Sequence, residues 1–232
     1  MIRNLWYALF RGTALDRAQL VIRRSPIWLR TGMVFIHVPK AASTSVSEAL
    51  YGRFLGHSRA ADVKRWGSPA VRSLPMVAIT RNPWDRLVSA YRFVKQGGGI
   101  GPNAGGVWRP GQYRIPEFET FERFVTDWLS RRDPRDLDLV FQPQWLFVCR
   151  TGGEILVDHL GRFEDLGATY TYLSSKVPGL PAIPRSNRSG DRIDYRTYYS
   201  PALVDLVGKI YADDVRLFGY DFEGGGPTSP SG

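Results

Sequence analysis

The chain has 232 residues, and 43% of them are hydrophobic, which is enough for one substantial core. Its 31 lysines and arginines against 22 aspartates and glutamates give a net charge of +9, which is compatible with nucleic acid, an acidic glycan or a nucleotide as a partner. The single cysteine, Cys149, excludes an intrachain disulfide scaffold.

Residues 1–24 carry charges at intervals of a few positions, a pattern that fits neither a signal peptide nor a membrane span. We expect residues 1–32 to form an N-terminal extension that packs on the domain, with an amphipathic helix at a membrane interface as the alternative. A cytoplasmic protein without a transmembrane segment is the resulting expectation.

The next stretch combines a strand pattern with a helix pattern. MVFIHV (33–38) is an apolar run typical of a buried strand, and SVSEALYGRF (45–54) has apolar residues at helical spacing, with Ser45 and Glu48 as a capping box. Lys40 therefore stands where the strand ends. Because the first N–H groups of a helix are unpaired, they and the lysine together favour an anion at this point.

The loop between these segments contains no glycine. PKAASTS differs from the Walker A loop, G-x-x-x-x-G-K-[ST], because its lysine comes first and both glycines are absent. Ala41 and Ala42 are small enough to let a phosphate approach the backbone, although alanine does not easily adopt a positive φ. An ordinary ATP or GTP kinase is therefore disfavoured. The plain alternative is a strand, a turn and a helix with a surface lysine.

A second strand, turn and helix follow. PMVAIT (75–80) predicts another buried strand, and Arg81 comes directly after it. Asn82 suits the N-cap of the next helix, Pro83 its first position and Asp85 its first turn. We therefore expect Arg81 at the carboxyl end of a strand, where open α/β sheets bind their ligands.

The remainder of the chain continues the alternation. Residues 96–112 are rich in glycine and predict a long loop, whereas residues 117–131 have the apolar spacing of one amphipathic helix. A strand is expected in 154–163, followed by further helices, and residues 223–232 should be a disordered tail. This pattern predicts one α/β domain with helical additions.

Together the two segments resemble the paired nucleotide-binding motifs of the sulfotransferases that use 3′-phosphoadenosine 5′-phosphosulfate (PAPS). HVPKAASTS resembles the 5′-phosphosulfate loop of that family, and RNPWDRLVSAY resembles its 3′-phosphate motif. The likeness is closest to the branch of carbohydrate O-sulfotransferases that act on glycosaminoglycans and to related bacterial enzymes. It is specific over residues 35–54 and 76–95. It implies a P-loop-NTPase-like three-layer domain over residues 33–222, with a central parallel sheet flanked by helices.

The resemblance also implies roles for individual residues. Lys40 would contact the bridging oxygen of the phosphosulfate, and Arg81 and Ser89 would bind the 3′-phosphate. The loop that would hold the 5′-phosphosulfate consists of Lys40, Ala41, Ala42, Ser43, Thr44 and Ser45. No metal is required, because positioning and charge stabilisation carry such a transfer. The expected acceptor is a hydroxyl, most naturally on a glycan, and the sequence leaves the oligomeric state open.

Three histidines are available as the general base of such a transfer. His37 and His159 lie in strand-like segments, where a packed or hydrogen-bonded role is expected. Related carbohydrate sulfotransferases place a histidine base between the two motifs, so the resemblance selects His57, with an exposed loop histidine as the alternative reading. Glu48 is the reserve candidate if its side chain faces the cleft.

Two other functions are compatible with these patterns. A metal-dependent nucleotide or small-molecule kinase with a divergent loop ranks second, although no metal cage is evident among three histidines and one cysteine. An inert module that binds polyanions or nucleic acid ranks third, because it gives Arg81 and Ser89 no role. Nucleic acid is therefore not the expected partner.

Overall fold

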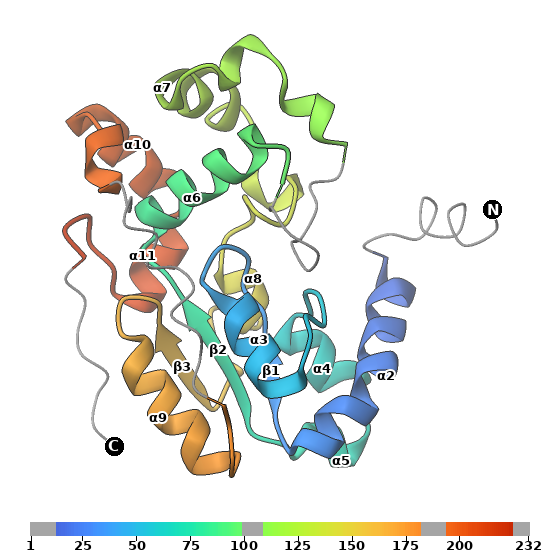
Figure 1. Cartoon of the computed structure of the whole chain (residues 1–232). Coiled ribbons are helices and arrows are strands. Elements are labelled where there is room, and N and C mark those ends of the chain that lie inside the picture. Colours follow the sequence, from blue (N-terminus) through green and yellow to red (C-terminus); the bar gives the residue numbers. More distant parts are fainter. Residues whose placement is uncertain (1–12, 99–108, 182–193, 225–232) are drawn as a thin grey trace.

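Three parallel strands form the centre of the molecule. The computed structural model describes residues 13–98, 109–181 and 194–224. Its sheet has the order β1-β2-β3, with strands Val34–Ile36, Met76–Thr80 and His159–Arg162 (Figure 1). Val34 lies opposite Met76, and Val77 lies opposite His159. Because parallel strands end at the same edge of a sheet, the residues that follow β1 and β2 come together there.

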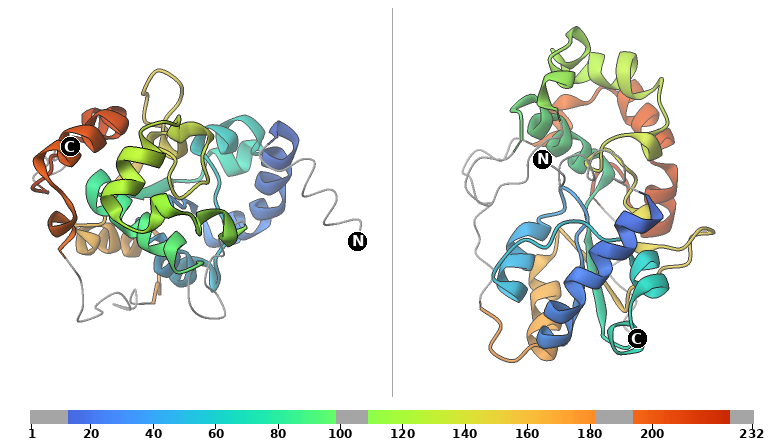
Figure 2. Two further views of the ribbon diagram at one scale, coloured as in Figure 1. Left: turned by 90° about the horizontal axis from the view of Figure 1, so that it is seen from above. Right: turned by 90° about the vertical axis from the view of Figure 1, so that its right-hand side faces the viewer.

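Helices cover the sheet on its two faces. Figure 2 shows α3 (Ser43–Tyr51) and α9 (Leu166–Lys176) on one side and α4 (Ala60–Trp66) on the other. Both α2 (Ala14–Thr31) and α5 (Pro69–Arg72) pack beside α4. Every residue of β1 and β2 is buried, as expected for strands that are covered on both faces. The predicted α/β architecture, with a parallel sheet between helices, is confirmed.

A helical layer lies beyond the carboxyl ends of the strands. There α6 (Pro83–Lys95) packs against α10 (Pro201–Ile210) and against two short 3₁₀ segments, η1 (Pro110–Tyr113) and η5 (Tyr195–Tyr198) (Figure 1). Aromatic rings fill this layer: Tyr91 stacks on Phe124 at 5.3 Å between ring centroids, and Phe124 stacks on Trp128 at 5.7 Å. This packing anchors α6, which begins just after Arg81 and its N-cap Asn82.

The prediction of a single amphipathic helix over residues 117–131 is wrong, because the segment changes its helix type. The segment divides into η2 (Pro116–Phe118), α7 (Phe121–Arg123) and a π-helical stretch, η3 (Phe124–Leu129). Thr120 starts a new helix because its side chain accepts a hydrogen bond from the N–H of Arg123. The predicted apolar residues are nevertheless buried, so the periodicity identified the core face.

Two smaller predictions also need correction. The strand expected in 154–163 is confined to its last part, β3, and Ile155 makes only an isolated antiparallel bridge with Cys149. The capping box of Ser45 and Glu48 is wrong, because α3 already begins at Ser43 and its N-cap is Ala42.

The remaining elements are short or close the chain: η4 (Pro134–Asp136), α8 (Trp145–Val148) and α11 (Ala212–Phe218). The predicted disordered tail lies almost wholly outside the described residues, as does most of the glycine-rich segment. In the described ranges, no helix combines the length and the hydropathy needed to cross a membrane.

Candidate active site

The loop after β1 has a backbone that normally requires glycine. Lys40 has φ = 67° and Ala42 has φ = 55°, both in the left-handed region. The expectation that alanine would avoid a positive φ is therefore wrong at Ala42. Each such residue costs about 1–2 kcal/mol, and strain of this kind concentrates at ligand-binding sites. Ala42 is also the N-cap of α3 and offers that helix no side-chain hydrogen bond.

The ammonium of Lys40 has no anionic partner in the described part of the chain. Its Nζ lies 4.0 Å from the centroid of the Phe93 ring. Burial, together with the neighbouring Arg81 and Arg86, lowers the pKa of Lys40 to about 8. A partly dehydrated cation beside two guanidinium groups favours a bound anion, because an anion would restore the lost interactions.

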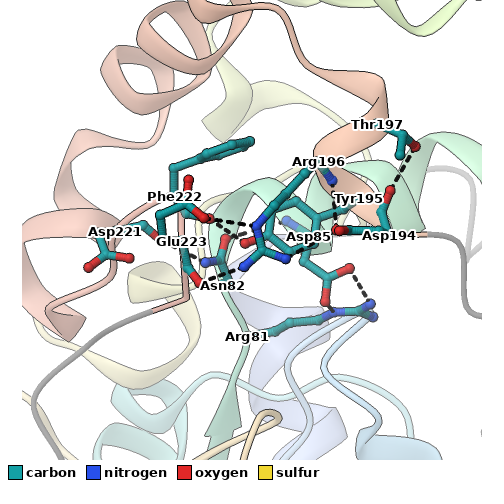
Figure 3. A network of polar contacts seen from close by, with 10 residues as sticks. All are labelled: Arg81, Asn82, Asp85, Asp194, Tyr195, Arg196, Thr197, Asp221, Phe222 and Glu223. Carbon is teal, nitrogen blue, oxygen red and sulfur yellow. Dashed lines mark hydrogen bonds and ion pairs between the residues drawn. The ribbon is translucent and has the colours of Figure 1, made fainter.

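Arg81 is held in place by several contacts. Its Nε and Nη2 donate to the two carboxylate oxygens of Asp85 at 2.9 and 2.7 Å (Figure 3). Its Nη1 donates to the carbonyl of Lys40 at 3.0 Å. The guanidinium lies over the ring of Phe163, at 4.1 Å. The Gln144 side chain bonds both the N–H and the C=O of Arg81. Since a guanidinium has five N–H donors, two remain for a ligand within the described structure.

The start of α6 follows the sequence prediction. The Asn82 side chain accepts hydrogen bonds from the N–H groups of Trp84 and Asp85, and its amide donates to the carbonyl of Asp221 at 2.8 Å. The N–H of Asn82 itself donates to Glu164 at 2.8 Å. The N-cap and the first-turn Asp85 are thus confirmed, and the whole turn is fixed by contacts from distant segments.

Ser89 lies on the same face of α6 as the two residues that contact the cations. Residues four apart share one face of a helix, so Asp85, Ser89 and Phe93 form one line along α6. Asp85 binds Arg81 and Phe93 lies under Lys40, which brings the half-buried Ser89 close to both. The structure therefore gathers three predicted site residues, Lys40, Arg81 and Ser89, along this face.

Sequence reasoning missed a buried arginine that supports the site. The guanidinium of Arg86 donates to the carbonyls of Pro39 and Gln142, at 3.0 and 2.6 Å, and the residue is only 1% exposed. Its burial lowers the pKa of Arg86. The signal in the sequence was weak: Arg86 stands among the apolar residues of α6, where an arginine is normally taken for a surface residue.

His57 and His37 form a contact pair beside the loop. His57 Nδ1 lies 2.9 Å from the carbonyl oxygen of His37 and 3.0 Å from its Nδ1. His37 Nε2 lies 3.4 Å from Thr44 Oγ1, in the first turn of α3. Burial lowers the pKa of His57 to about 4, and Arg24 and Arg86 act in the same direction. Burial also lowers the pKa of His37 well below its usual value, so both rings are neutral at pH 7.

The structure places the other candidate residues in different surroundings. His57 is part of this pair and not an exposed loop histidine. His159 begins β3, at the end of the sheet opposite the loop, and stacks on Tyr172 at 4.0 Å, in keeping with a structural role. Glu48 lies one helical turn after Thr44, on the same face of α3. Ser45 is half-buried, and the side chain of Ser43 lies outside the described structure.

A cavity of about 430 Å³ lies on the other side of the Asn82 cap. Its lining is Asn82, Asp85, Glu164, Asp194, Tyr195, Arg196, Glu223 and Gly224. Arg196 is already bound to Asp194 and Glu223, as Figure 3 shows. Carboxylates outnumber cations here, so a phosphate group is favoured at Lys40 and Arg81 and not in this cavity. Within the described residues, no three His, Cys, Asp or Glu side chains gather as a metal site would require.

Comparison with models of protein families identifies the family of the chain. The model of the sulfotransferase family matches residues 29–221, which include all three strands and both strand–loop–helix units. A search of curated proteins found no match, and a search of solved structures found none either.

Proposed function

The chain belongs to the sulfotransferase family, and we propose that it transfers a sulfuryl group from PAPS to a hydroxyl of a carbohydrate acceptor. The observation that carries this proposal is the placement of two neighbouring cations, Lys40 and Arg81, one after each strand, with a hydrogen bond from Arg81 to the carbonyl of Lys40. Lys40 adjoins the N-terminus of α3, the positive end of that helix, whereas the guanidinium of Arg81 retains two N–H donors within the described structure. Two anion positions, one after each strand, suit a nucleotide with phosphate groups at both its 5′ and 3′ positions.

In this proposal each unit binds one end of the donor. Lys40 contacts the bridging oxygen of the 5′-phosphosulfate, and Arg81 and Ser89 bind the 3′-phosphate. The loop that wraps the 5′ group consists of Lys40, Ala41, Ala42, Ser43, Thr44 and Ser45. The left-handed backbone at Lys40 and Ala42 supports this assignment, because it shapes the loop for close approach of an anion without glycine.

The chemistry follows from the positions of charge and proton acceptor. The acceptor oxygen attacks sulfur in line while the bond from sulfur to the bridging oxygen breaks, and the electron pair leaves with the 3′,5′-bisphosphate. Lys40 and the N-terminus of α3 stabilise that developing negative charge. His57 takes the proton of the attacking hydroxyl. The bound nucleotide is an anion, so it raises the pKa of His57 from its low value in the free protein towards neutrality.

Other parts of the proposal rest on the sequence. The motif resemblance gives a sulfotransferase domain at residues 33–222, with residues 1–32 as an extension and residues 223–232 as a tail. The cytoplasmic location that we propose rests on the charge pattern of residues 1–24 and not on the resemblance. The helix α2 packs on the domain through the buried Val21 and Trp28, which supports the role given to the extension. Carbohydrate is the acceptor class, because the motifs are closest to that branch.

The test is transfer of labelled sulfate from PAPS to a panel of polysaccharides and small alcohols. We expect product with at least one polysaccharide, without added metal. The variant Arg81→Ala should lose transfer, and Arg150→Ala, a change at an exposed residue paired with Glu154, should not. A magnesium-dependent reaction that prefers ATP to PAPS would contradict the proposal and support the kinase alternative.

A further inference from the structure

We infer that His37 is a positioning residue: it fixes the proton of His57 on Nδ1 and ties that ring to Thr44 in the phosphate loop. The inference rests on the proposed function, in which His57 is the base. Three contacts carry it: His57 Nδ1 with the His37 carbonyl at 2.9 Å, His57 Nδ1 with His37 Nδ1 at 3.0 Å, and His37 Nε2 with Thr44 Oγ1 at 3.4 Å.

The first contact assigns the tautomer of His57. A carbonyl oxygen has no hydrogen to donate, so a ring nitrogen at 2.9 Å from it must carry the proton. A neutral imidazole has one N–H, which leaves the lone pair of His57 on Nε2. That nitrogen is the one available to a substrate hydroxyl.

The second and third contacts assign the tautomer of His37. Because His57 Nδ1 carries a hydrogen, His37 Nδ1 at 3.0 Å must be the acceptor, and the proton of His37 lies on Nε2. His37 Nε2–H then points to the hydroxyl oxygen of Thr44. Thr44 accepts this bond, so its own hydrogen is free for an anion in the loop. The result is a hydrogen-bond chain with one direction, from the base to the donor site.

The surroundings favour this neutral arrangement. The ring of Phe54 contacts both imidazoles edge-on, at centroid distances of 4.6 Å to His37 and 5.4 Å to His57. The charged groups that act on the pair are cations: Arg24 from α2, Lys40 from the loop and Arg86 from α6. They disfavour a protonated ring until an anion binds nearby.

Proton transfer strengthens the same contacts. When His57 gains the substrate proton on Nε2, its Nδ1–H becomes a charged donor to the carbonyl and Nδ1 of His37. Hydrogen bonds from charged groups are stronger than neutral ones, by an amount that corresponds to about one pKa unit. Removal of the His37 ring acceptor should therefore lower the pKa of His57 in the donor complex.

Three variants separate the two functions of the His37 ring. His37→Asn places an amide oxygen near the position of Nδ1 and keeps the acceptor for His57, whereas His37→Gln places an amide near Nε2 and keeps the bond to Thr44. His37→Phe keeps the ring volume and loses both. His159→Gln changes the histidine outside the site and serves as the control.

The expected result is a split between two kinetic parameters. With His37→Phe and His37→Gln, kcat should fall about tenfold, and the acidic limb of its pH profile should move down by about one pH unit. With His37→Asn, kcat should be largely restored, but KM for PAPS should rise, because Thr44 is no longer oriented. Equal losses in all three variants, without a shift of the pH profile, would reduce His37 to a packing residue.

The wild-type protein provides a test that does not depend on folding of the variants. Nitrogen-15 NMR of the imidazoles should show His57 protonated on Nδ1 and His37 protonated on Nε2. The opposite tautomer of His57 would overturn the inference. If wild-type protein shows these tautomers but transfers no sulfuryl group from PAPS, the proposed function is contradicted, whereas the hydrogen-bond chain is supported.

Discussion

The site is built from two strand–loop–helix units: the β1 unit, which is β1 and α3 (residues 34–51), and the β2 unit, which is β2 and α6 (residues 76–95). The two units have the same order of elements, but they differ in how the helix begins. In the β1 unit, Ala42 caps α3 without a side-chain hydrogen bond and in a left-handed conformation, and the ammonium of Lys40 lies over the Phe93 ring without an anionic partner among the described residues. In the β2 unit, Asn82 caps α6 with its side chain, and the guanidinium of Arg81 makes three hydrogen bonds.

In the proposed function, this difference matches two tasks of the site, recognition and transfer. The β2 unit presents a guanidinium held by several contacts, which suits a group that only has to be recognised. The β1 unit presents the positive end of α3 and an ammonium with no anionic partner among the described residues, which suits a group whose charge grows during the reaction. Both cations lie over a phenylalanine ring, at 4.0 Å in the β1 unit and 4.1 Å in the β2 unit, so apolar support is what the two units share.

The largest effect is expected at the unpaired cation. Lys40→Met should lower kcat by about 10³-fold, because it removes the charge that stabilises the leaving bisphosphate. Binding of 3′-phosphoadenosine 5′-phosphate (PAP) should weaken much less. Initial rates at saturating PAPS measure the first quantity, and calorimetry measures the second. If kcat stays within a few-fold of wild type, Lys40 does not stabilise the transition state.

The histidine pair should make the fold sensitive to acid. The pKa of His57 is about 4 in the folded protein and about 6.5 when unfolded, so the unfolded chain binds more protons between these values. Stability therefore rises with pH across this window and is lost as the pH falls, by about 3 kcal/mol for His57 alone. Urea unfolding at pH 7, 6 and 5 should show this slope, and it should be smaller in His57→Gln. An identical slope in both proteins would show that His57 titrates normally.

A third effect concerns nucleotide affinity at high pH. Free Lys40 has a pKa of about 8, and a bound anion raises it. Above pH 8 the Kd for PAP should therefore rise, by up to tenfold per pH unit until the pKa of the complex is reached. Lys40→Arg should remove this dependence, because arginine stays protonated. Titration calorimetry from pH 7 to 9.5 measures the Kd of PAP for wild-type protein and for Lys40→Arg. A wild-type Kd that does not change with pH would contradict this prediction.

The smallest effects are expected on the free energy of unfolding, and they should have opposite signs in the two units. Asn82→Ala removes an N-cap and should lower the free energy of unfolding by about 1–2 kcal/mol. Ala42→Gly relieves a left-handed alanine and should raise it by roughly 0.5–1 kcal/mol, since glycine takes this conformation freely. Urea denaturation of both variants measures the contrast. A destabilised Ala42→Gly protein would show that the loop of the β1 unit is not strained.

Local patterns in the sequence were enough for much of this site. The strand ends, Arg81 at the edge of the sheet and the Asn82 cap follow from apolar runs and capping rules, which act over a few residues. The contacts of Arg86 with Pro39 and of Gln144 with Arg81 join segments more than forty positions apart, and no periodicity encodes them. The positive φ of Ala42 was missed for another reason: alanine itself disfavours it, and only the assembled loop imposes it.

The central claim is that the two units bind the two phosphate-bearing ends of one nucleotide. The most direct measurement compares, by calorimetry, the Kd of PAP with that of adenosine 5′-monophosphate, which differs only in lacking the 3′-phosphate. We expect PAP to bind about 100-fold more tightly to wild-type protein, and both nucleotides to bind alike to Arg81→Ala. Equal affinities in the wild type, or a preference for PAP that survives in Arg81→Ala, would contradict the claim.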